Sequence, residues 1–178
     1  INGRTDGNEM SAPIQSHLRG IDALNPFDYG IPIVRAAGFT TCYTGPGSGN
    51  VIGGTGISFK LRGKTVEDMA IPGSEQMKMA LGENPKTAYG ERKMSPMTRM
   101  GTAGVLRETL ANAREYARKL QESEEKGTEP PKYDFRMESL VKVVRGEMKV
   151  RIHCHRSDDI VTAIRVAEEF GLDFALEH

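Results

Sequence analysis

The sequence feature that most constrains the fold is a strand–helix–strand pattern in the last third of the chain. Residues 149–154, which include most of the run Val-Arg-Ile-His-Cys-His at 150–155, and residues 173–176 are short and mostly apolar, which predicts two buried strands. Between them, an amphipathic helix begins at Ser157 or Asp158 and ends before Gly171. This order with short turns is typical of a parallel βα unit. Each strand delivers histidine at its C-terminal end, where barrel enzymes place metal ligands and catalytic groups.

The remainder of the chain contains further predicted elements of the same kinds. Apolar periodicity predicts a helical stretch broken near residues 30–32, a long amphipathic helix and a third, shorter helix, at residues 21–37, 98–123 and 134–145. Runs of β-branched and apolar residues predict strands at residues 39–43, 57–61 and 76–81. We therefore expect an α/β fold of the partial TIM-type (β/α)8 barrel kind.

Length bears on how much of such a barrel is present. A complete eight-unit barrel takes about 250 residues, and the chain has 178. We therefore expect a fragment, with residues 1–178 forming a single incomplete (β/α) barrel catalytic domain. Residues 1–22 are polar and predicted to be a loop, and residues 122–132 are predicted to be a charged surface loop on the barrel rim.

Composition limits the classes of partner. Lys and Arg together number 24, as do Asp and Glu, so the net charge is zero and no broad electrostatic surface for nucleic acid or membrane is expected. A small molecule is the expected partner. Cys42 and Cys154 lie in predicted core strands without CxxC spacing, which indicates buried thiols in a reducing compartment. With no apolar run of about 20 residues and no signal-peptide core, we expect a cytoplasmic protein.

The histidines suggest a metal site. Zinc and related divalent metals favour imidazole and carboxylate ligands. His153 and His178 come from successive parallel strands, which lie about 4.8 Å apart, so their side chains can converge on one ion or on neighbouring ions. His155 shares the face of His153 if the strand continues, and it is a candidate for substrate binding. A single histidine at a strand end is more often an ordinary polar residue, and His17 is expected to be structural or on the surface.

Other candidates lie in loops. The glycine-dense residues 45–56 suggest a phosphate-binding loop, but the sequence neither opens into a helix nor contains Gly-Lys-Ser/Thr, which favours a tight structural or substrate-facing loop. Asn50 and Arg99, with His155, are polar residues near predicted loop ends on the same face. They are candidates for substrate binding, with a structural role as the alternative for each.

Several stretches resemble the amidohydrolase superfamily, close to its imidazolonepropionase-related and prolidase-like members. The stretches that carry the resemblance are residues 150–155, residues 158–160 (Asp-Asp-Ile), residues 176–178 (Leu-Glu-His), residues 46–54 (Pro-Gly-Ser-Gly-Asn-Val-Ile-Gly-Gly) and residues 77–86 (Met-Lys-Met-Ala-Leu-Gly-Glu-Asn-Pro-Lys). The resemblance covers nearly all of the chain and implies a segment from roughly the second to the sixth strand of the barrel.

The resemblance implies a metal-dependent hydrolase that cleaves C–N bonds in amides or cyclic amides with one or two divalent metals, usually zinc. Family ligands on the fifth and sixth strands fall on His153 and His178. The fourth-strand ligand falls on Lys78, which would have to be carboxylated, or on the competing Glu83. In this family metal lowers the pKa of bound water toward about 7 and polarises the substrate carbonyl.

The same resemblance implies elements outside the printed sequence. The His-x-His pair of the first strand is expected before Ile1, and the catalytic aspartate of the eighth strand beyond His178. We therefore expect the chain alone to bind metal weakly and to catalyse nothing, and to form a homo-oligomer or associate with the missing parts of the barrel. Two other hypotheses remain open: a catalytically silent barrel homologue that acts as a binding or assembly protein, and a phosphate-binding barrel enzyme that uses residues 45–56.

Overall fold

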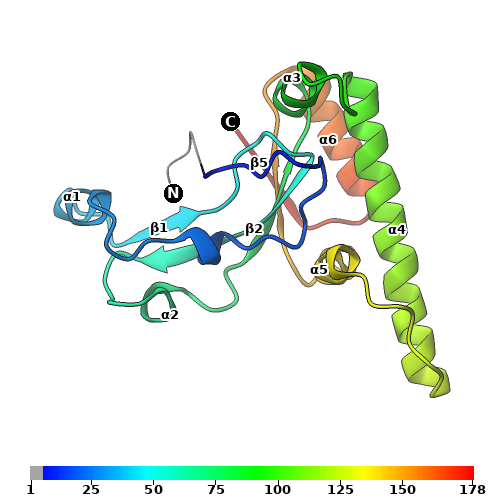
Figure 1. Cartoon of the computed structure of the whole chain (residues 1–178), viewed down its shortest axis with the longest axis horizontal. Helices are drawn as coiled ribbons and strands as arrows, with labels where there is room; N and C mark the ends of the chain where they lie inside the picture. Colours follow the sequence, from blue (N-terminus) through cyan, green and yellow to red (C-terminus); the bar gives the residue numbers. More distant parts are fainter. Residues whose placement is uncertain (1–5) are drawn as a thin grey trace.

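The fold is an α/β half-barrel, a curled mixed sheet with helices packed on one side (Figure 1). The computed structural model describes residues 6–178, and residues 1–5 of the predicted N-terminal loop lie outside this range. Within the described residues, one five-stranded sheet has the order β1-β2-β3-β4-β5. Its strands are Thr41–Thr44, Ile52–Lys60, Gln76–Ala80, Val150–His153 and Phe174–Glu177.

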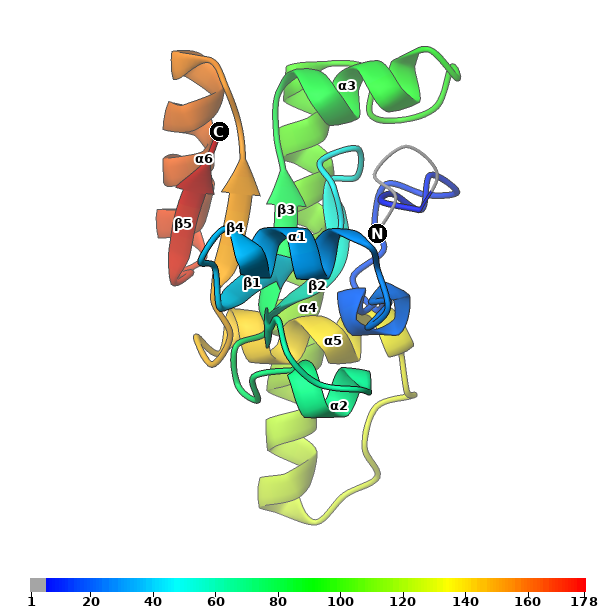
Figure 2. The same cartoon turned by 90° about the vertical axis from the view of Figure 1, so that its left-hand side faces the viewer.

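Strands β3, β4 and β5 are parallel and in register. Lys78 pairs with Arg151, and His153 pairs with Ala80 on one side and Glu177 on the other. Figure 2 shows the three strands side by side with their C-terminal ends toward helix α3 (Glu83–Gly90). The predicted parallel βα arrangement therefore applies to this part of the sheet.

Strands β1 and β2 depart from the expected parallel units. β1 is antiparallel to β2, and β2 is antiparallel to β3. Connection length explains the first of these pairings, because a parallel crossover needs a dozen or more residues and only residues 45–51 join β1 to β2. The ribbon formed by β1 and β2 projects away from the helical layer together with α1 (Gly30–Ala36) and α2 (Val66–Met69) (Figure 1).

The main core lies between the parallel strands and three helices. These helices are α4 (Arg99–Lys126), α5 (Phe135–Val144) and α6 (Ser157–Glu169). Alternate strand residues face them, so that the core brings together side chains such as Met79 and Ile152 from the sheet with Leu106 and Leu110 from α4. The helices predicted at residues 98–123, at residues 134–145 and between Ser157 and Gly171 therefore form close to their expected bounds. Helix α4 continues to Lys126, so the first residues of the predicted loop 122–132 are helical.

The predicted helical stretch 21–37 forms only in its second half. A short 3-10 turn, Gly20–Ala23, is followed by an irregular segment before α1. In that segment the Asn25 side chain accepts a hydrogen bond from the Phe27 N–H, and the Asp28 side chain accepts one from the Gly30 N–H. Such local side-chain bonds compete with helix formation and explain why the helix begins late.

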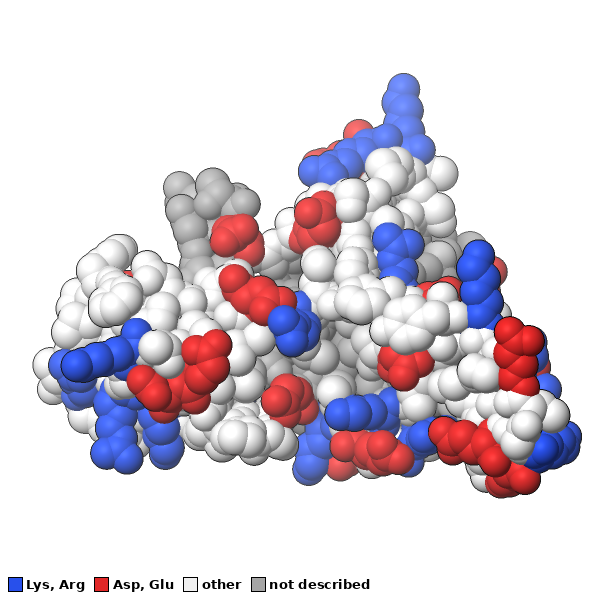
Figure 3. Space-filling model, turned by 60° about the horizontal axis from the view of Figure 1, so that its bottom comes forward, with Lys and Arg blue, Asp and Glu red and all other residues white. Residues whose placement is uncertain are grey.

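The surface carries both signs of charge. On the face shown in Figure 3, Lys and Arg are interspersed with Asp and Glu and no region of one sign dominates. Along α4, Arg118 pairs with Glu115 and Glu122, which produces this mixed pattern. In the described part of the chain, every helix is too short or too polar to cross a lipid bilayer.

Candidate metal centre

Three histidines meet at the C-terminal ends of β4 and β5. One ring nitrogen from each of His153, His155 and His178 falls within 4.8 Å of the other two. The ring centroid of His153 lies 4.5 Å from that of His155 and 4.6 Å from that of His178. The centroids of His155 and His178 are 5.3 Å apart. His153 is buried, and the other two are exposed. The structure thus brings together the three histidines that the sequence singled out.

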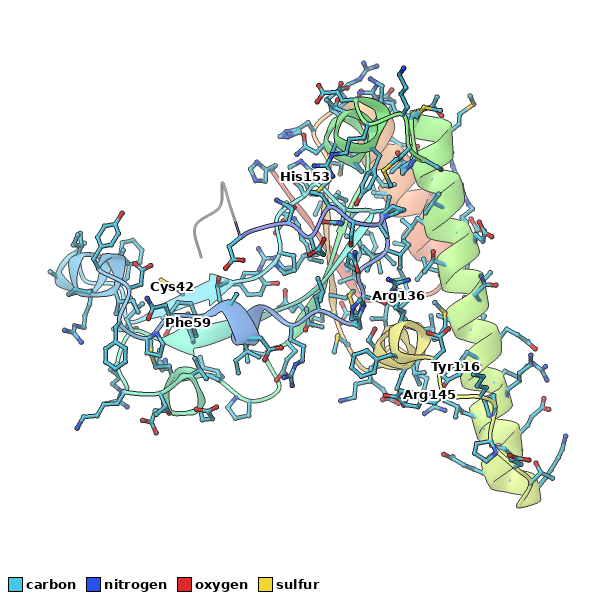
Figure 4. The ribbon with its side chains drawn as sticks, in the orientation of Figure 1. Cys42, Phe59, Tyr116, Arg136, Arg145 and His153 are labelled. Carbon is cyan, nitrogen blue, oxygen red and sulfur yellow. The ribbon has the colours of Figure 1, made fainter. Side chains whose placement is uncertain are left out.

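Strand alternation explains which way His153 points. Val150 and Ile152 face the helices and are fully buried in the core, so Arg151 and His153 face the concave side of the half-barrel. Because β4 and β5 are parallel and in register, His178 follows directly after the partner of His153, Glu177. Figure 4 shows His153 at the end of the sheet near α3, away from the contact between α4 and α5 where Tyr116 and Arg145 are labelled.

The environment of His153 favours a neutral imidazole. Burial lowers the pKa of His153 to about 4, and the nearby Lys78, His155 and His178 lower it as well. The Nε2 atom lies 2.9 Å from the side-chain nitrogen of Asn84. The Nδ1 atom is buried and has no hydrogen-bond partner among the described residues. Neutral imidazole with a free ring nitrogen is the form that binds metals.

Lys78 lies on the same concave face, and its side chain forms an ion pair. Its ammonium group pairs with Glu177, whose other carboxylate oxygen accepts from Arg151 at 2.7 Å. Arg151 in turn lies over the ring of Tyr43, with 4.4 Å between guanidinium carbon and ring centroid. Burial lowers the pKa of Lys78 to about 8, and the charge of Arg151 lowers it in the same direction. As an ammonium ion, Lys78 offers no lone pair to a metal.

Glu83, the competing candidate for the fourth-strand ligand, lies at the start of α3. Its carboxylate accepts from Arg99 at 2.7 Å and from Lys86 at 3.2 Å, and the side chain is half exposed. Arg99 also pairs with the buried Asp159, at 3.1 Å. The structure therefore places Glu83 and Arg99 in one ion-pair network, outside the group of three histidines. Both remain predictions, Glu83 as a metal ligand and Arg99 as a substrate contact.

Asn50 belongs to the loop between β1 and β2, and its side chain is buried. Its side-chain nitrogen donates to the carbonyl of Glu9 at 2.6 Å and to that of Ala12 at 3.0 Å, and it lies 2.9 Å from the hydroxyl of Tyr89. Only 1% of Asn50 is exposed. These contacts tie the N-terminal segment to the loop, and the predicted substrate contact of Asn50 is still to be tested. His17 is separate from the histidine cluster and packs edge-on against Phe135.

Only the first part of the predicted loop 45–56 is a loop in the structure: residues 45–51 join β1 to β2, and residues 52–56 belong to β2. The segment does not open into a helix, so it presents no helix N-terminus to a phosphate. A cavity of about 390 Å³ borders this loop and is lined by the acidic residues Asp6, Glu9 and Asp22. Arg19, which also lines the cavity, is paired with Asp22 at 2.8 Å. This charge does not favour an anion.

The residue that sequence reasoning missed is Asn84. It contacts both His153 and the hydroxyl of Ser48, the latter at 2.7 Å. Its position just after a parallel strand was the available signal, because loops at that end of a sheet carry functional residues. The sequence prediction named the neighbouring Glu83 instead, because the family resemblance offers a glutamate as the alternative fourth-strand ligand.

Fold and site together define a half-barrel whose parallel strands end in a histidine cluster. The chain is similar to two known proteins. An amidohydrolase from Thermotoga maritima MSB8, solved as a crystal structure, matches with a TM-score of 0.94 and 43% sequence identity. The match covers 97% of this chain and 45% of that one. Amidohydrolase tasK from Hapsidospora irregularis is 31% identical over 197 residues, which cover 100% of this chain and 20% of tasK.

These likenesses support placement of the chain in the amidohydrolase family. The chain spans about a fifth of the length of tasK and less than half of the Thermotoga structure. No protein-family model matches the sequence. Neither relative's name distinguishes the imidazolonepropionase-related and prolidase-like members, so that narrower assignment remains a proposal.

Proposed function

We propose that this chain is part of a metal-dependent hydrolase that cleaves C–N bonds in amides or cyclic amides other than ordinary peptide bonds. The observation that carries the proposal is the convergence of His153, His155 and His178, with one ring nitrogen of each within 4.8 Å of the others. The two similar proteins are both named amidohydrolases, which supports a hydrolase function. The narrower placement near imidazolonepropionase-related and prolidase-like enzymes rests on the sequence resemblance.

The residues present fit a divalent metal such as zinc. His153 offers a buried, unpartnered Nδ1 atom, and its lowered pKa keeps the ring neutral at neutral pH. We assign His153 and His178 as ligands, with His155 as a third ligand or a contact to the substrate. A metal bound there would activate a water molecule for attack and polarise the substrate carbonyl.

Lys78 fits the site only as a carbamate. In that reaction the neutral amine of Lys78 attacks the carbon of carbon dioxide, an N–C bond forms, and a proton leaves to solvent. The product is an anionic oxygen ligand in place of a cation. The lowered pKa of Lys78 supports this step, because more of the amine is neutral near neutral pH than in an ordinary lysine. If Lys78 stays unmodified, Glu83 is the alternative ligand.

Metal content tests the proposal most directly. The protein that carries this sequence is incubated with zinc, dialysed and analysed for bound metal, together with a His153→Ala, His178→Ala double variant. The matched control is His17→Ala, because His17 lies outside the cluster. We expect stoichiometric metal in the wild type and the control, and loss of metal in the double variant. A wild type that stays metal-free would refute the proposal and leave a catalytically silent binding or assembly protein.

Two further variants address the fourth-strand ligand. Loss of metal in Lys78→Met with metal retained in Glu83→Gln would assign Lys78, and the reverse would assign Glu83. Once metal is established, a panel of amides and cyclic amides identifies the substrate class. Hydrolysis that requires the metal supports the proposed reaction, and an inactive metal-loaded protein contradicts it.

The open sheet edges support a proposal about assembly. Within the described residues, β1 and β5 each pair with one strand only. Unpaired edges are covered in stable proteins, so we propose that a second copy or further strands of the same protein complete the barrel. Sedimentation analysis of the purified protein distinguishes a monomer from a homo-oligomer.

A further inference from the structure

Asn84, at the start of α3, connects the buried His153 to Ser48 in the loop between β1 and β2. Its side-chain nitrogen lies 2.9 Å from Nε2 of His153 and 2.7 Å from the hydroxyl oxygen of Ser48. One end of the carboxamide therefore faces both groups. On the other side of the same imidazole ring, Nδ1 is buried and has no partner among the described residues.

Two hydrogen-bonding arrangements satisfy these distances. The two ends of a carboxamide have the same shape, so the surrounding hydrogen bonds decide which end is oxygen. If nitrogen faces His153, it donates to Nε2 and to Ser48, and the ring proton must lie on Nδ1. If oxygen faces His153, it accepts from the Nε2–H and from the Ser48 hydroxyl, and Nδ1 carries a lone pair.

The second arrangement is the one that suits the site. The first leaves a buried N–H group without an acceptor in the described part of the chain, and such orphaned donors are rare in folded proteins. The second leaves a lone pair on the buried Nδ1, and His153 is one of three histidines that each have a ring nitrogen within 4.8 Å of the others. Metal-binding histidines commonly donate their other ring N–H to an oxygen acceptor, which fixes the tautomer and the ring orientation.

We propose that Asn84, supported by Ser48, is a positioning residue that holds His153 as its Nε2–H tautomer and thereby presents Nδ1 to a divalent cation. This inference rests on the metal site of the proposed function. It gives Asn84 a role toward the metal without direct contact. His155 and His178 are exposed, and neither makes a comparable side-chain hydrogen bond within the described residues, so the effect is specific to the buried ring.

The backbone around Asn84 is held in place from two sides. Gly82 has φ +78°, and a Cβ atom at this position would overlap the carboxylate of Asp159. Arg99 bridges Asp159 at the start of α6 and Glu83 at the start of α3. The first turn of α3, which carries Asn84, is thereby tied to the first turn of α6, which follows His153 in the chain. This rigidity is what a residue needs in order to orient a metal ligand.

The test measures the tautomer directly in the metal-free protein. Histidine labelled with ¹⁵N is incorporated, and long-range ¹H–¹⁵N correlation spectra report which ring nitrogen of His153 carries the proton. The His153→Ala variant identifies the signals. We expect the Nε2–H tautomer in the wild type and a mixture of tautomers in Asn84→Ala. A wild type in the Nδ1–H tautomer would overturn the proposal, as would an Asn84→Ala spectrum identical to wild type.

Zinc affinity supplies the second measurement, by competition with a chelator of known affinity. We expect Asn84→Ala to weaken zinc binding by about 10- to 100-fold, the usual effect of losing such a supporting hydrogen bond. Asn84→Asp keeps an oxygen acceptor and should retain the tautomer and affinity within a few-fold. Asn112→Ala, on the exposed face of α4, is the control and should match wild type. Unchanged affinity in Asn84→Ala would contradict the proposal.

The two measurements separate this inference from the proposed function. A wild type that binds no zinc refutes the metal site, while the tautomer of the metal-free protein still supports or overturns the assignment of Asn84. If Asn84→Ala does not fold, as judged by circular dichroism, Ser48→Ala replaces it. This variant removes the hydroxyl donor that orients the carboxamide, so the share of the Nδ1–H tautomer should rise. An unchanged share would overturn the proposal.

Discussion

Replacing Asn50 with alanine tests whether this buried side chain holds the fold or binds substrate. The Asn50 side-chain nitrogen donates to the carbonyl groups of Glu9 and Ala12, and it also lies against the hydroxyl of Tyr89. The Tyr89 hydroxyl itself donates to the Ala12 carbonyl, at 2.7 Å. Asn50→Ala therefore leaves the Ala12 carbonyl with one donor and removes the side-chain donor of the Glu9 carbonyl.

The expected loss of stability follows from these contacts. A hydrogen bond in a protein contributes about 0.5–1.5 kcal/mol net, and a buried acceptor left without a donor costs about 1–3 kcal/mol. Asn50→Ala removes two hydrogen bonds, and Glu9 is exposed, so water can replace the donor to its carbonyl; we expect the free energy of unfolding to fall by about 1–3 kcal/mol. Tyr89→Phe removes the hydroxyl but leaves the Asn50 donor on the Ala12 carbonyl, so we expect about 1 kcal/mol. The double variant should lose less than the sum, because the two side chains share one network.

Urea unfolding followed by circular dichroism measures these changes in stability. The alternative role of Asn50, contact with the substrate, is measured as KM for a substrate found in the hydrolysis panel. A lower urea midpoint for Asn50→Ala with unchanged KM supports the structural role. An unchanged midpoint with a raised KM would refute the reasoning and support the substrate contact predicted from the sequence.

Three other substitutions test the stability of the fold, one next to the site and two on α4. Gly82→Ala should lower the free energy of unfolding by more than about 1 kcal/mol, since alanine is strained at φ +78° and its Cβ would displace Asp159; an unchanged urea midpoint would contradict this. Gly104→Ala is the matched case on α4, where a Cβ meets nothing within 4 Å, and it should stabilise by about 0.5–1 kcal/mol. Leu110→Ala empties a fully buried position and should cost about 2–5 kcal/mol in the same assay, whereas a loss below 1 kcal/mol would mean that the core collapses around the gap.

Local periodicity predicted the C-terminal half of the fold well. The apolar spacing of α4 and the strand–helix–strand unit from β4 to β5 depend on neighbouring residues, which the sequence displays directly. The stretch 21–37 was predicted less well, because the side chains of Asn25 and Asp28 accept hydrogen bonds from backbone N–H groups and the helix begins only at Gly30. The antiparallel pairing of β1 and β2 was not predicted, for another reason. Strand direction depends on the length of the connection, and the predicted strand bounds did not define that length well enough to decide the direction.

The histidine cluster could be predicted because strand ends meet by topology. Parallel strands in register carry their C-terminal residues to one edge, so His153 and His178 converge without any information from distant loops. Asn84 could not be predicted in this way. Its position depends on the positive φ of Gly82 and on Asp159, which comes from a different part of the chain. Contacts of this kind follow from the tertiary structure and leave no local pattern.

The charges on the concave face connect the state of Lys78 to occupancy of the site. Lys78 and Arg151 are cations that share one carboxylate, that of Glu177, and Lys78 is close enough to His153 to lower the pKa of the imidazole. An unmodified face of this kind opposes a dication beside the histidines, because like charges repel strongly where water is excluded. A carbamate on Lys78 reverses the sign of one of the two cations, and Arg151 remains to balance Glu177. Metal content should therefore rise with dissolved carbon dioxide in the wild type and lose that dependence in Lys78→Met.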